Sequence, residues 1–440
     1  MPYYESETPR RDLPLKETTT LWNGDEISPS NNAVLKAMEW KLSPQSKGSK
    51  SEPFCVMDLG YVHNQYEHWE KSLPSVTPFY AVKCNPDVHI IGLLGSLGCG
   101  FDCASRSEIE LVLGQGIPAG RIIFANPCKK PSDINFARKI GVNRMTFDNE
   151  AELHKIKQLF PESQLVLRCF ASDPSATYCL SSKFGAHPEA SMSLLECAKS
   201  LGLNVIGVSF HVGSSSKDPK AFEIAIQNSR RIFDAGSRMG HNMRLLDIGG
   251  GFSESTFDDM AESIQRSLDF HFGDIDAELV AEPGRYFAAG ALTVACEIIA
   301  RRDAKETPPS AEEATNMLYL NDGIYGTFLC NLFEPGPLPR VLCASGIFYP
   351  QTAVSDRATY IIWGPTCDGT DCIAKGVELP ERLTFGDWLY FPDMGAYSTC
   401  LTTGFNGFES HRETIYVSSN SLTIEFLTKV NKTMCKEQTH

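Results

Sequence analysis

Eight short apolar runs follow one another along the chain, and nearly every one ends in a polar residue or a glycine. They are found in PFYAVKCNPD (78–87), FDCAS (101–105), IIFAN (122–126), RMTFD (144–148), LVLRC (165–169), VSFHVG (208–213), LLDIGGG (245–251) and LVAEPGR (279–285). Apolar runs this short predict buried strands. Most are separated by stretches with helical periodicity, so the pattern predicts an α/β fold built on a (β/α)8 barrel of the TIM type.

Three of the intervening stretches predict helices with identifiable ends. Residues 104–116 follow the second strand, with Ser105 as the N-cap and Glu108 at the third helical position. Residues 149–160 follow the fourth strand. Residues 219–236 follow the sixth strand, and we expect that helix to begin at Pro219 and to end at Gly236.

The pattern changes after residue 300. Residues 301–316 are polar and contain two prolines, which predicts a surface loop. The segments MLYLND, ATYIIWG, DWLYFPD and TIYVSSN then predict a mostly β C-terminal domain. We therefore expect an N-terminal segment over 1–58 whose start is disordered, a barrel over 59–291 and a β-rich domain over 292–440.

Composition narrows the class of protein. The net charge of −14 argues against nucleic-acid binding, which usually needs a basic face. We find no run of ~18 apolar residues, so we expect no membrane span. The first residues lack the apolar core of a signal peptide. The 15 cysteines include no CxxC pair, so we expect reduced thiols in a cytoplasmic protein and no metal site.

Residues with potential catalytic or binding roles stand where the predicted strands end. Lys83 ends the first strand, and it is either an ordinary surface lysine or one that forms a Schiff base with an aldehyde. Gly249, Gly250 and Gly251 follow the seventh strand, where they form either a tight turn or a backbone cradle for an anion.

The eighth strand ends in Glu282 and Arg285, at a place where barrels commonly hold phosphate. A lysine for an aldehyde, a carboxylate for a pyridinium nitrogen and a phosphate cradle together indicate pyridoxal 5′-phosphate. His211, after the sixth strand, is either a core histidine or a residue that stacks on the cofactor ring. Its place between the predicted ring and phosphate sites favours stacking.

Nine segments distributed over residues 50–420 closely resemble the eukaryotic ornithine decarboxylase family. They are PFYAVKCN, GFDCASRSEIE, ANPCK, TFDNEAEL, SFHVGS, LLDIGGGF, EPGRY, WGPTCDGTD and GDWLYFPDMGAY. That family belongs to the fold-type III, alanine-racemase-like pyridoxal-phosphate enzymes. The resemblance implies a barrel, a β domain that includes N-terminal residues, and a homodimer whose two active sites lie at the subunit interface.

The resemblance also implies roles for individual residues. Lys83 would hold the cofactor covalently, His211 would stack on its ring, and Glu282 would pair with the pyridine nitrogen. Cys367 from the partner subunit would act near Cα after carbon dioxide leaves, and Asp368 would reach the distal amine of the substrate. The phosphate would be bound by Ser214, Gly249, Gly250, Gly251, Arg285 and Tyr397, and Asp102, Glu108 and Arg168 would surround the cofactor.

One segment departs from the family. Phe333, Glu334 and Pro335 stand where the family usually carries an aromatic residue, an aspartate and a histidine. The family's aspartate binds the distal ammonium of ornithine, and a glutamate keeps that charge on a longer side chain. Proline in place of histidine removes a donor and stiffens the loop. Phe333 and Glu334 are therefore predicted substrate-binding residues, and the substrate stays open.

Three functions are compatible with these residues. The first is decarboxylation of L-ornithine or a closely related basic amino acid. The second is decarboxylation of a modified or non-standard amino acid in secondary, alkaloid-type metabolism, which the altered loop motivates. The third is an inactive regulator that resembles antizyme inhibitors, and the retained Lys83, Glu282 and Cys367 argue against it. An antizyme-like regulator is a further expected partner of an active enzyme.

Overall fold

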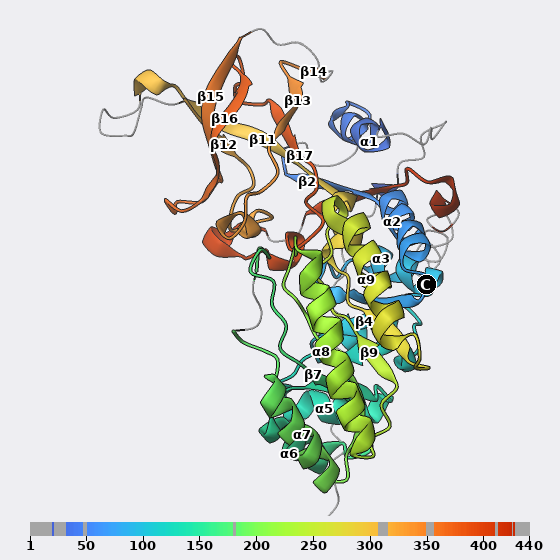
Figure 1. Ribbon diagram of the computed structural model, residues 1–440. Helices are drawn as coiled ribbons and strands as arrows, with labels where there is room; N and C mark the ends of the chain where they lie inside the picture. Colours follow the sequence, from blue (N-terminus) through green and yellow to red (C-terminus); the bar gives the residue numbers. More distant parts are fainter. Residues whose placement is uncertain are drawn as a thin grey trace, which may run out of the picture.

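The computed structural model describes residues 20–21, 32–46, 51–178, 182–306, 316–348, 356–409, 412–424 and 426. The predicted disorder at the start of the chain and much of the predicted surface loop over 301–316 lie outside these residues. In Figure 1 the described chain forms two parts, a barrel surrounded by helices and a β-rich part that lies against one end of it.

Eight parallel strands close the barrel, because the last strand, β10, pairs with both β9 and the first strand, β3. The strands are β3 (Val76–Ala81), β4 (Gly100–Cys103), β5 (Ile122–Phe124), β6 (Arg144–Phe147), β7 (Gln164–Arg168), β8 (Asn204–Ser209), β9 (Leu245–Asp247) and β10 (Glu278–Ala281). Each overlaps one of the eight apolar runs, although β8 begins four residues before its run. The structure thus confirms the predicted barrel and its strands.

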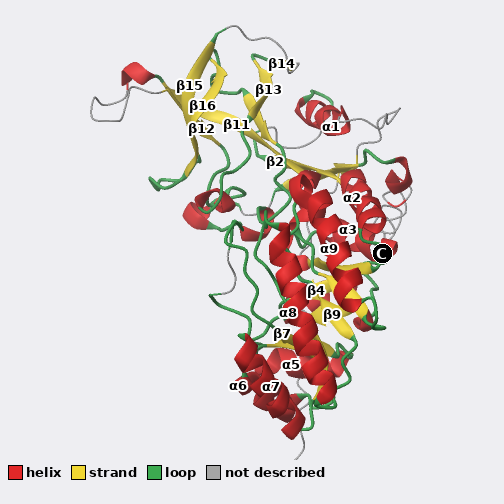
Figure 2. Ribbon diagram, viewed as in Figure 1, coloured by secondary structure: helices red, strands yellow, loops and turns green. Residues whose placement is uncertain are grey.

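Helices cover the outside of the barrel (Figure 2). They are α2 (Leu59–Ser72), α3 (Val88–Leu97), α4 (Arg106–Gly114), α5 (Pro131–Ile140), α6 (Glu150–Leu159), α7 (Pro188–Ser200), α8 (Pro219–Arg238), α9 (Phe257–Phe272) and the short α10 (Arg285–Ala288). The long side chains of α8 and α9 bury an apolar stripe that includes Phe222, Phe233, Ile264 and Phe272. All three predicted helices are present.

The predicted end of α8 at Gly236 is wrong, because the helix continues to Arg238. Gly236 is buried, and a Cβ atom added to it would lie 2.9 Å from the sulfur of Met243. The glycine therefore allows close packing inside the helix. The turn that follows is made at Gly240, where φ is +83°.

The β-rich part contains a ten-stranded sheet whose main path runs β1-β18-β2-β11-β12-β15-β16. Its strands are β1 (Thr20–Leu21), β2 (Phe54–Asp58), β11 (Leu292–Arg302), β12 (Asn316–Leu320), β13 (Arg340–Ala344), β14 (Ile347–Phe348), β15 (Arg357–Trp363), β16 (Cys372–Pro380), β17 (Trp388–Phe391) and β18 (Glu413–Val417). Helix α1 (Asn32–Leu42) packs Ala37 and Met38 against this sheet. The domain limits at 58 and 291 stay a prediction, and they lie beside the starts of α2 and β11.

Short 3-10 turns join many of these elements: η1 (Val82–Cys84), η2 (Ala119–Arg121), η3 (Glu254–Thr256), η4 (Ala289–Ala291), η5 (Ala304–Glu306), η6 (Leu329–Leu332), η7 (Thr399–Leu401) and η8 (Phe405–Gly407). Residues after β17 lie on the carboxyl end of β3, where the Tyr397 N–H donates to the Cys84 carbonyl at 2.9 Å. Asn85 Nδ2 also donates to the Gly395 carbonyl at 2.9 Å. The β-rich part thereby covers the barrel end at which the strand-terminal side chains meet. Among the described residues, no helix is both long and apolar enough to cross a membrane.

Candidate active site

A cavity of about 340 Å³ lies at the carboxyl end of the barrel, between the strand ends and the β-rich part. It brings together most of the predicted site residues, from both parts of the chain. Its walls are formed by Ala81, Lys83, Tyr178, His211, Ser214, Gly250, Gly251, Phe252, Glu282, Gly284, Arg285, Cys330, Phe333, Glu334, Tyr397 and Leu401.

Lys83 stands in the η1 turn directly after β3, and its ammonium forms an ion pair with the Asp102 carboxylate at the end of the neighbouring strand β4. The lysine side chain is 41% exposed because it projects into the cavity, whereas Asp102 is fully buried. Burial disfavours the charge of Lys83, but the carboxylates of Asp102 and Glu282 outweigh that effect and raise its pKa. The ion pair with Asp102 therefore keeps Lys83 protonated in this structure.

Three carboxyl groups lie close together under the cavity: Asp102, Asp247 at the end of β9, and Glu282 just after β10. Burial raises the pKa of Glu282 well above its ordinary value, and the charges of Asp102 and Asp247 raise it further. Burial likewise raises the pKa of Asp247, to about 7. The cluster can hold protons at neutral pH, which suits a group that must share a proton with a basic ring nitrogen.

His211 follows β8, and its Nδ1 accepts a hydrogen bond from the Gly213 N–H at 3.1 Å. Burial lowers the pKa of His211 well below its ordinary value, and the charges of Arg168 and Lys83 lower it further. The ring is therefore neutral at pH 7, with its proton on Nε2. A neutral, oriented ring is suited to stacking on a flat aromatic ligand.

The glycine segment after β9 has no room for side chains. Gly249 and Gly251 have φ values of +65° and +117°, and a Cβ atom on Gly249 would lie 2.0 Å from the Phe210 carbonyl oxygen. A Cβ atom on Gly250 would lie 2.7 Å from the carbonyl oxygen of Glu282 and 2.9 Å from Nε2 of His211. These positions require glycine, and they let the backbone approach a bound anion closely.

Arg285, the first residue of α10, lies beside these glycines with its side chain 18% exposed. Its Nη2 donates to both carboxylate oxygens of Glu334, at 2.9 and 3.2 Å. Its Nε is buried and has no hydrogen-bond partner among the described residues. The Tyr397 ring lies 5.4 Å from the guanidinium carbon, and Tyr397 itself adopts a φ of +55°, which is unusual for a residue with a side chain.

Glu108 and Arg168, which were predicted to surround the cofactor, make contacts outside the cavity. Glu108 accepts a hydrogen bond from the Ala104 N–H at 2.6 Å, while Ser105 caps α4 by accepting from the Glu108 N–H at 3.3 Å. Arg168, the last residue of β7, places its guanidinium 5.2 Å from the Phe184 ring. Neither lines the cavity, so their predicted part in cofactor binding stays a prediction.

Cys367 and Asp368 do not line the cavity of their own chain. Cys367 is exposed, and its N–H donates to Asn406 Oδ1 at 3.1 Å. The Asp368 carboxylate accepts a hydrogen bond from the hydroxyl of Tyr325. Asp371 orders this loop, because it is buried and accepts from the Thr366 and Ile324 N–H groups at 2.9 and 2.7 Å. The loop is held by these hydrogen bonds, and neither Cys367 nor Asp368 lines the cavity beside Lys83.

The sequence reasoning missed several residues of the site. Asp247 could have been found, because it is the last residue of a strand and lies two positions before the glycine segment. Cys330 lines the cavity next to the predicted Phe333 and Glu334. Tyr178 comes from the long connection after β7, where no sequence pattern signals a contact with the cavity.

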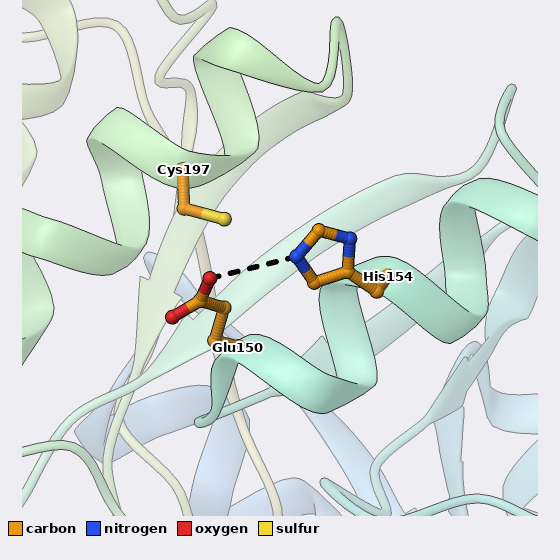
Figure 3. Close-up of side chains that lie close together, drawn as sticks. All are labelled: Glu150, His154 and Cys197. Carbon is orange, nitrogen blue, oxygen red and sulfur yellow. Dashed lines mark ion pairs between the residues drawn. The ribbon is translucent and has the colours of Figure 1, made fainter.

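A separate cluster of potential metal ligands lies on the outside of the barrel (Figure 3). Glu150 and His154 stand one turn apart on α6, with a carboxylate-to-Nε2 distance of 3.5 Å, and Cys197 approaches them from α7. The Glu150 and His154 side chains are 68% and 54% exposed. We interpret this group as a surface ion pair beside a cysteine, since nothing else at the site points to a bound ion.

Comparisons with known proteins now bear on this geometry. The family model described as "Pyridoxal-dependent decarboxylase, pyridoxal binding domain" matches residues 59–289. The chain belongs to this family. The match confirms the resemblance on which the predicted roles rest, and its limits nearly coincide with those of the predicted barrel.

Individual relatives of this decarboxylase agree. It is 64% identical to Decarboxylase flvG of Aspergillus flavus over 89% of this chain and 92% of the relative. It is 46% identical to the ornithine decarboxylase of Schizosaccharomyces pombe over 87% of both chains. The structure of the Paramecium bursaria Chlorella virus arginine decarboxylase matches with a TM-score of 0.80 and 35% identity, covering 87% of this chain and 100% of that one.

The decarboxylase uses pyridoxal phosphate, and the residues present fit this cofactor. Lys83 projects into the cavity, the buried Glu282 lies at its wall, and the glycine segment leaves backbone space for an anion. The unpartnered Nε of Arg285 is a further donor for such an anion. When bound, the cofactor supplies the electron sink that weakens the bond between Cα and the carboxylate of an amino acid.

Proposed function

We propose that this enzyme decarboxylates L-ornithine or a closely related basic amino acid to the corresponding amine. In the net reaction the bond from Cα to the carboxylate carbon breaks, carbon dioxide leaves, and one proton replaces it on Cα. The observation that carries the substrate class is the acidic side chain of Glu334 on the cavity wall. The relatives named as ornithine and arginine decarboxylases support the same class.

The charges of the site favour a substrate with a cationic nitrogen beyond Cα. Glu334 lines the cavity, and Asp368 is the predicted acid from the second subunit. Arg285 pairs with Glu334 in this structure, but two carboxylates turned toward an uncharged substrate side chain would leave their charges uncompensated in a partly buried pocket. An ammonium or guanidinium group would compensate them.

Each residue near the reacting atoms has a task that matches its surroundings. Lys83 holds the cofactor, and the Asp102 carboxylate pairs with its ammonium. Glu282 holds a proton at the ring nitrogen, and neutral His211 orients the ring. The proton that replaces carbon dioxide on Cα requires a nearby acid, and the thiol of Cys367 is chemically suited to that role.

We also propose a homodimer in which the partner subunit's Cys367 and Asp368 complete each cavity. The support is that both residues lie on an ordered loop outside the cavity of their own chain. A two-fold dimer would exchange these loops reciprocally between the two sites.

The thirteen described cysteines are all free thiols, which supports a reducing, cytoplasmic location.

The substrate proposal is tested by measuring carbon dioxide release from ornithine, lysine, arginine, 2,4-diaminobutyrate, N-alkylated diamino acids and leucine. We expect one or more of the cationic amino acids to be turned over, with stoichiometric amine product, and leucine to be inert. Efficient turnover of leucine with every cationic amino acid inert would refute the proposed class.

A modified or non-standard basic amino acid is the second candidate. It is favoured by the substitutions at Glu334 and Pro335, together with the higher identity to Decarboxylase flvG than to the ornithine decarboxylase of Schizosaccharomyces pombe. If this candidate is right, Glu334→Asp should improve the turnover of ornithine. Efficient wild-type turnover of ornithine that Glu334→Asp impairs would instead identify ornithine as the substrate.

An inactive, antizyme-inhibitor-like role receives little support. Lys83, His211, Glu282 and Arg285 are retained and gathered around one cavity, as an active enzyme requires. Binding of an antizyme-like regulator to the active enzyme stays a prediction, which co-purification with such a regulator would test.

A further inference from the structure

The ion pair between Arg285 and Glu334 joins the two parts of the chain across the cavity. Arg285 begins α10 of the barrel, and Glu334 lies two residues beyond η6, in the β-rich part. Both side chains are largely buried, at 18% and 14% exposure. The Glu334 N–H also donates to the Cys330 carbonyl at 3.1 Å, so its backbone is held in place.

Glu334 is the principal counter-charge of Arg285 in the described structure. Burial disfavours the guanidinium charge, and Glu334 is the largest of the influences that stabilise it. The Nε of Arg285 is buried and has no hydrogen-bond partner in the described part of the chain. A buried guanidinium that loses its only carboxylate is strongly destabilised, so Arg285 needs an anion at all times.

We propose that Glu334 and the cofactor phosphate are alternative counter-ions of Arg285, so that binding of the phosphate releases the Glu334 carboxylate toward the substrate. This inference rests on the proposed phosphate-binding role of Arg285. A phosphate dianion beside Arg285 supplies more negative charge than one carboxylate, and the two anions repel each other at one guanidinium. Glu334 then becomes available for the cationic end of a substrate only in the cofactor-loaded enzyme.

The exchange predicts that removing the Glu334 charge strengthens cofactor binding. If Glu334 only held Arg285 in place for the phosphate, removing that charge would weaken cofactor binding. Glu334→Gln leaves Arg285 without a counter-charge in the cofactor-free protein, and the phosphate restores that charge in the loaded protein. The substitution therefore destabilises the free form more than the loaded form. By linkage, the variant binds the cofactor more tightly than the wild type does.

The test is the dissociation constant of cofactor-free protein for pyridoxal phosphate, measured by fluorescence and absorbance titration, with pyridoxal as the matched ligand that lacks the phosphate. Glu334→Gln should bind pyridoxal phosphate about tenfold more tightly, the change expected when one charged hydrogen bond is removed from competition. Its affinity for pyridoxal should change less than about twofold. The melting temperature of the cofactor-free variant should fall, and that of the loaded variant should fall less.

Glu278→Gln is the matched control variant. Glu278 forms a two-bonded pair with Arg144, at 2.7 and 2.9 Å, at the opposite, amino end of the barrel. Its loss should change both melting temperatures equally and leave the affinity for pyridoxal phosphate unchanged. If Glu334→Gln does not fold, Glu334→Asp, whose shorter carboxylate pairs less well with Arg285, should show a smaller shift in the same direction.

Unchanged or weaker binding of pyridoxal phosphate by the folded Glu334 variants would overturn the inference. Arg285→Ala separates this failure from failure of the proposed phosphate role. If Arg285→Ala weakens pyridoxal phosphate binding while the Glu334 variants leave it unchanged, only the exchange is wrong. If Arg285→Ala also has no effect, Arg285 does not bind the phosphate.

Discussion

Asp247 offers a test of the carboxyl cluster that does not depend on turnover. Its side chain is completely buried at the end of β9. Oδ1 accepts a hydrogen bond from the Gly249 N–H at 2.8 Å, and the side chain also interacts with the Glu282 carboxyl group. Asp247→Asn keeps the shape and the acceptor for Gly249, and it imitates the protonated acid at every pH.

The expected magnitude follows from the raised pKa of Asp247, about 7 in the folded protein against 3.8 ordinarily. Between these values the unfolded chain is ionised while the folded protein retains its proton, so stability falls as the pH rises. About three pKa units at about 1.4 kcal/mol each give an upper limit of about 4 kcal/mol. Asp247→Asn escapes this loss and should be more stable than the wild type above pH 7.

The assay is urea denaturation of the cofactor-free protein between pH 4 and pH 8. The difference in unfolding free energy between Asp247→Asn and the wild type should be small at pH 4 and grow with pH, reaching about 2–4 kcal/mol at pH 8. A difference that does not depend on pH, or a wild type that is the more stable at pH 8, would refute the reasoning.

Asp173→Asn is a control with the opposite sign. Burial alone would raise the pKa of Asp173, but hydrogen bonds from Ser216 and Ser175 outweigh it and hold the pKa below its ordinary value. Its carboxylate accepts from Ser216 Oγ at 2.6 Å and from the Lys217 N–H at 3.0 Å. This variant should therefore be less stable than the wild type at pH 8, and the difference should shrink as the pH falls through the acidic range.

Two further predictions concern the glycine segment and the assembly. Gly250→Ala places a methyl group against the Glu282 carbonyl and His211, so cofactor affinity should fall by about tenfold or more, whereas Gly114→Ala, with no atom within 4 Å, should leave it unchanged in the same titration. Unaltered binding by Gly250→Ala would contradict the proposed cradle. Mixing inactive Lys83→Ala and Cys367→Ala proteins under subunit exchange should restore up to about a quarter of wild-type activity, because one hybrid site then has both residues. Mixtures that stay inactive, although exchange is demonstrated by mass spectrometry, would show that both residues act within one chain.

The barrel could be predicted from the sequence because each strand is a short apolar run whose end carries a polar residue or a glycine. Lys83, His211 and Glu282 stand at such ends, and the closed sheet brings them to one cavity as expected. The end of α8 could not be predicted in this way. Gly236 is required by its close packing against Met243 and does not end the helix, and a local sequence rule does not reveal such a contact.

The ion pairs of the site were harder to predict than the residues that line it. Arg285 and Glu334 are 49 residues apart and belong to different parts of the chain, so no local pattern pairs them. The prediction that Glu334 faces a substrate ammonium was made from the loop alone, and the structure adds Arg285 as a competing partner. The proposed place of Cys367 depends on a second subunit, which the pattern of one chain does not describe.

The covalent attachment of the cofactor to Lys83 tests the central claim most directly. Purified enzyme should be reduced with borohydride, digested and examined by mass spectrometry, with Lys83→Ala treated in parallel. We expect a phosphopyridoxyl group on the peptide that contains Lys83, loss of all decarboxylase activity after reduction, and no label in the variant. Attachment to a different lysine, or full activity in Lys83→Ala, would contradict the account.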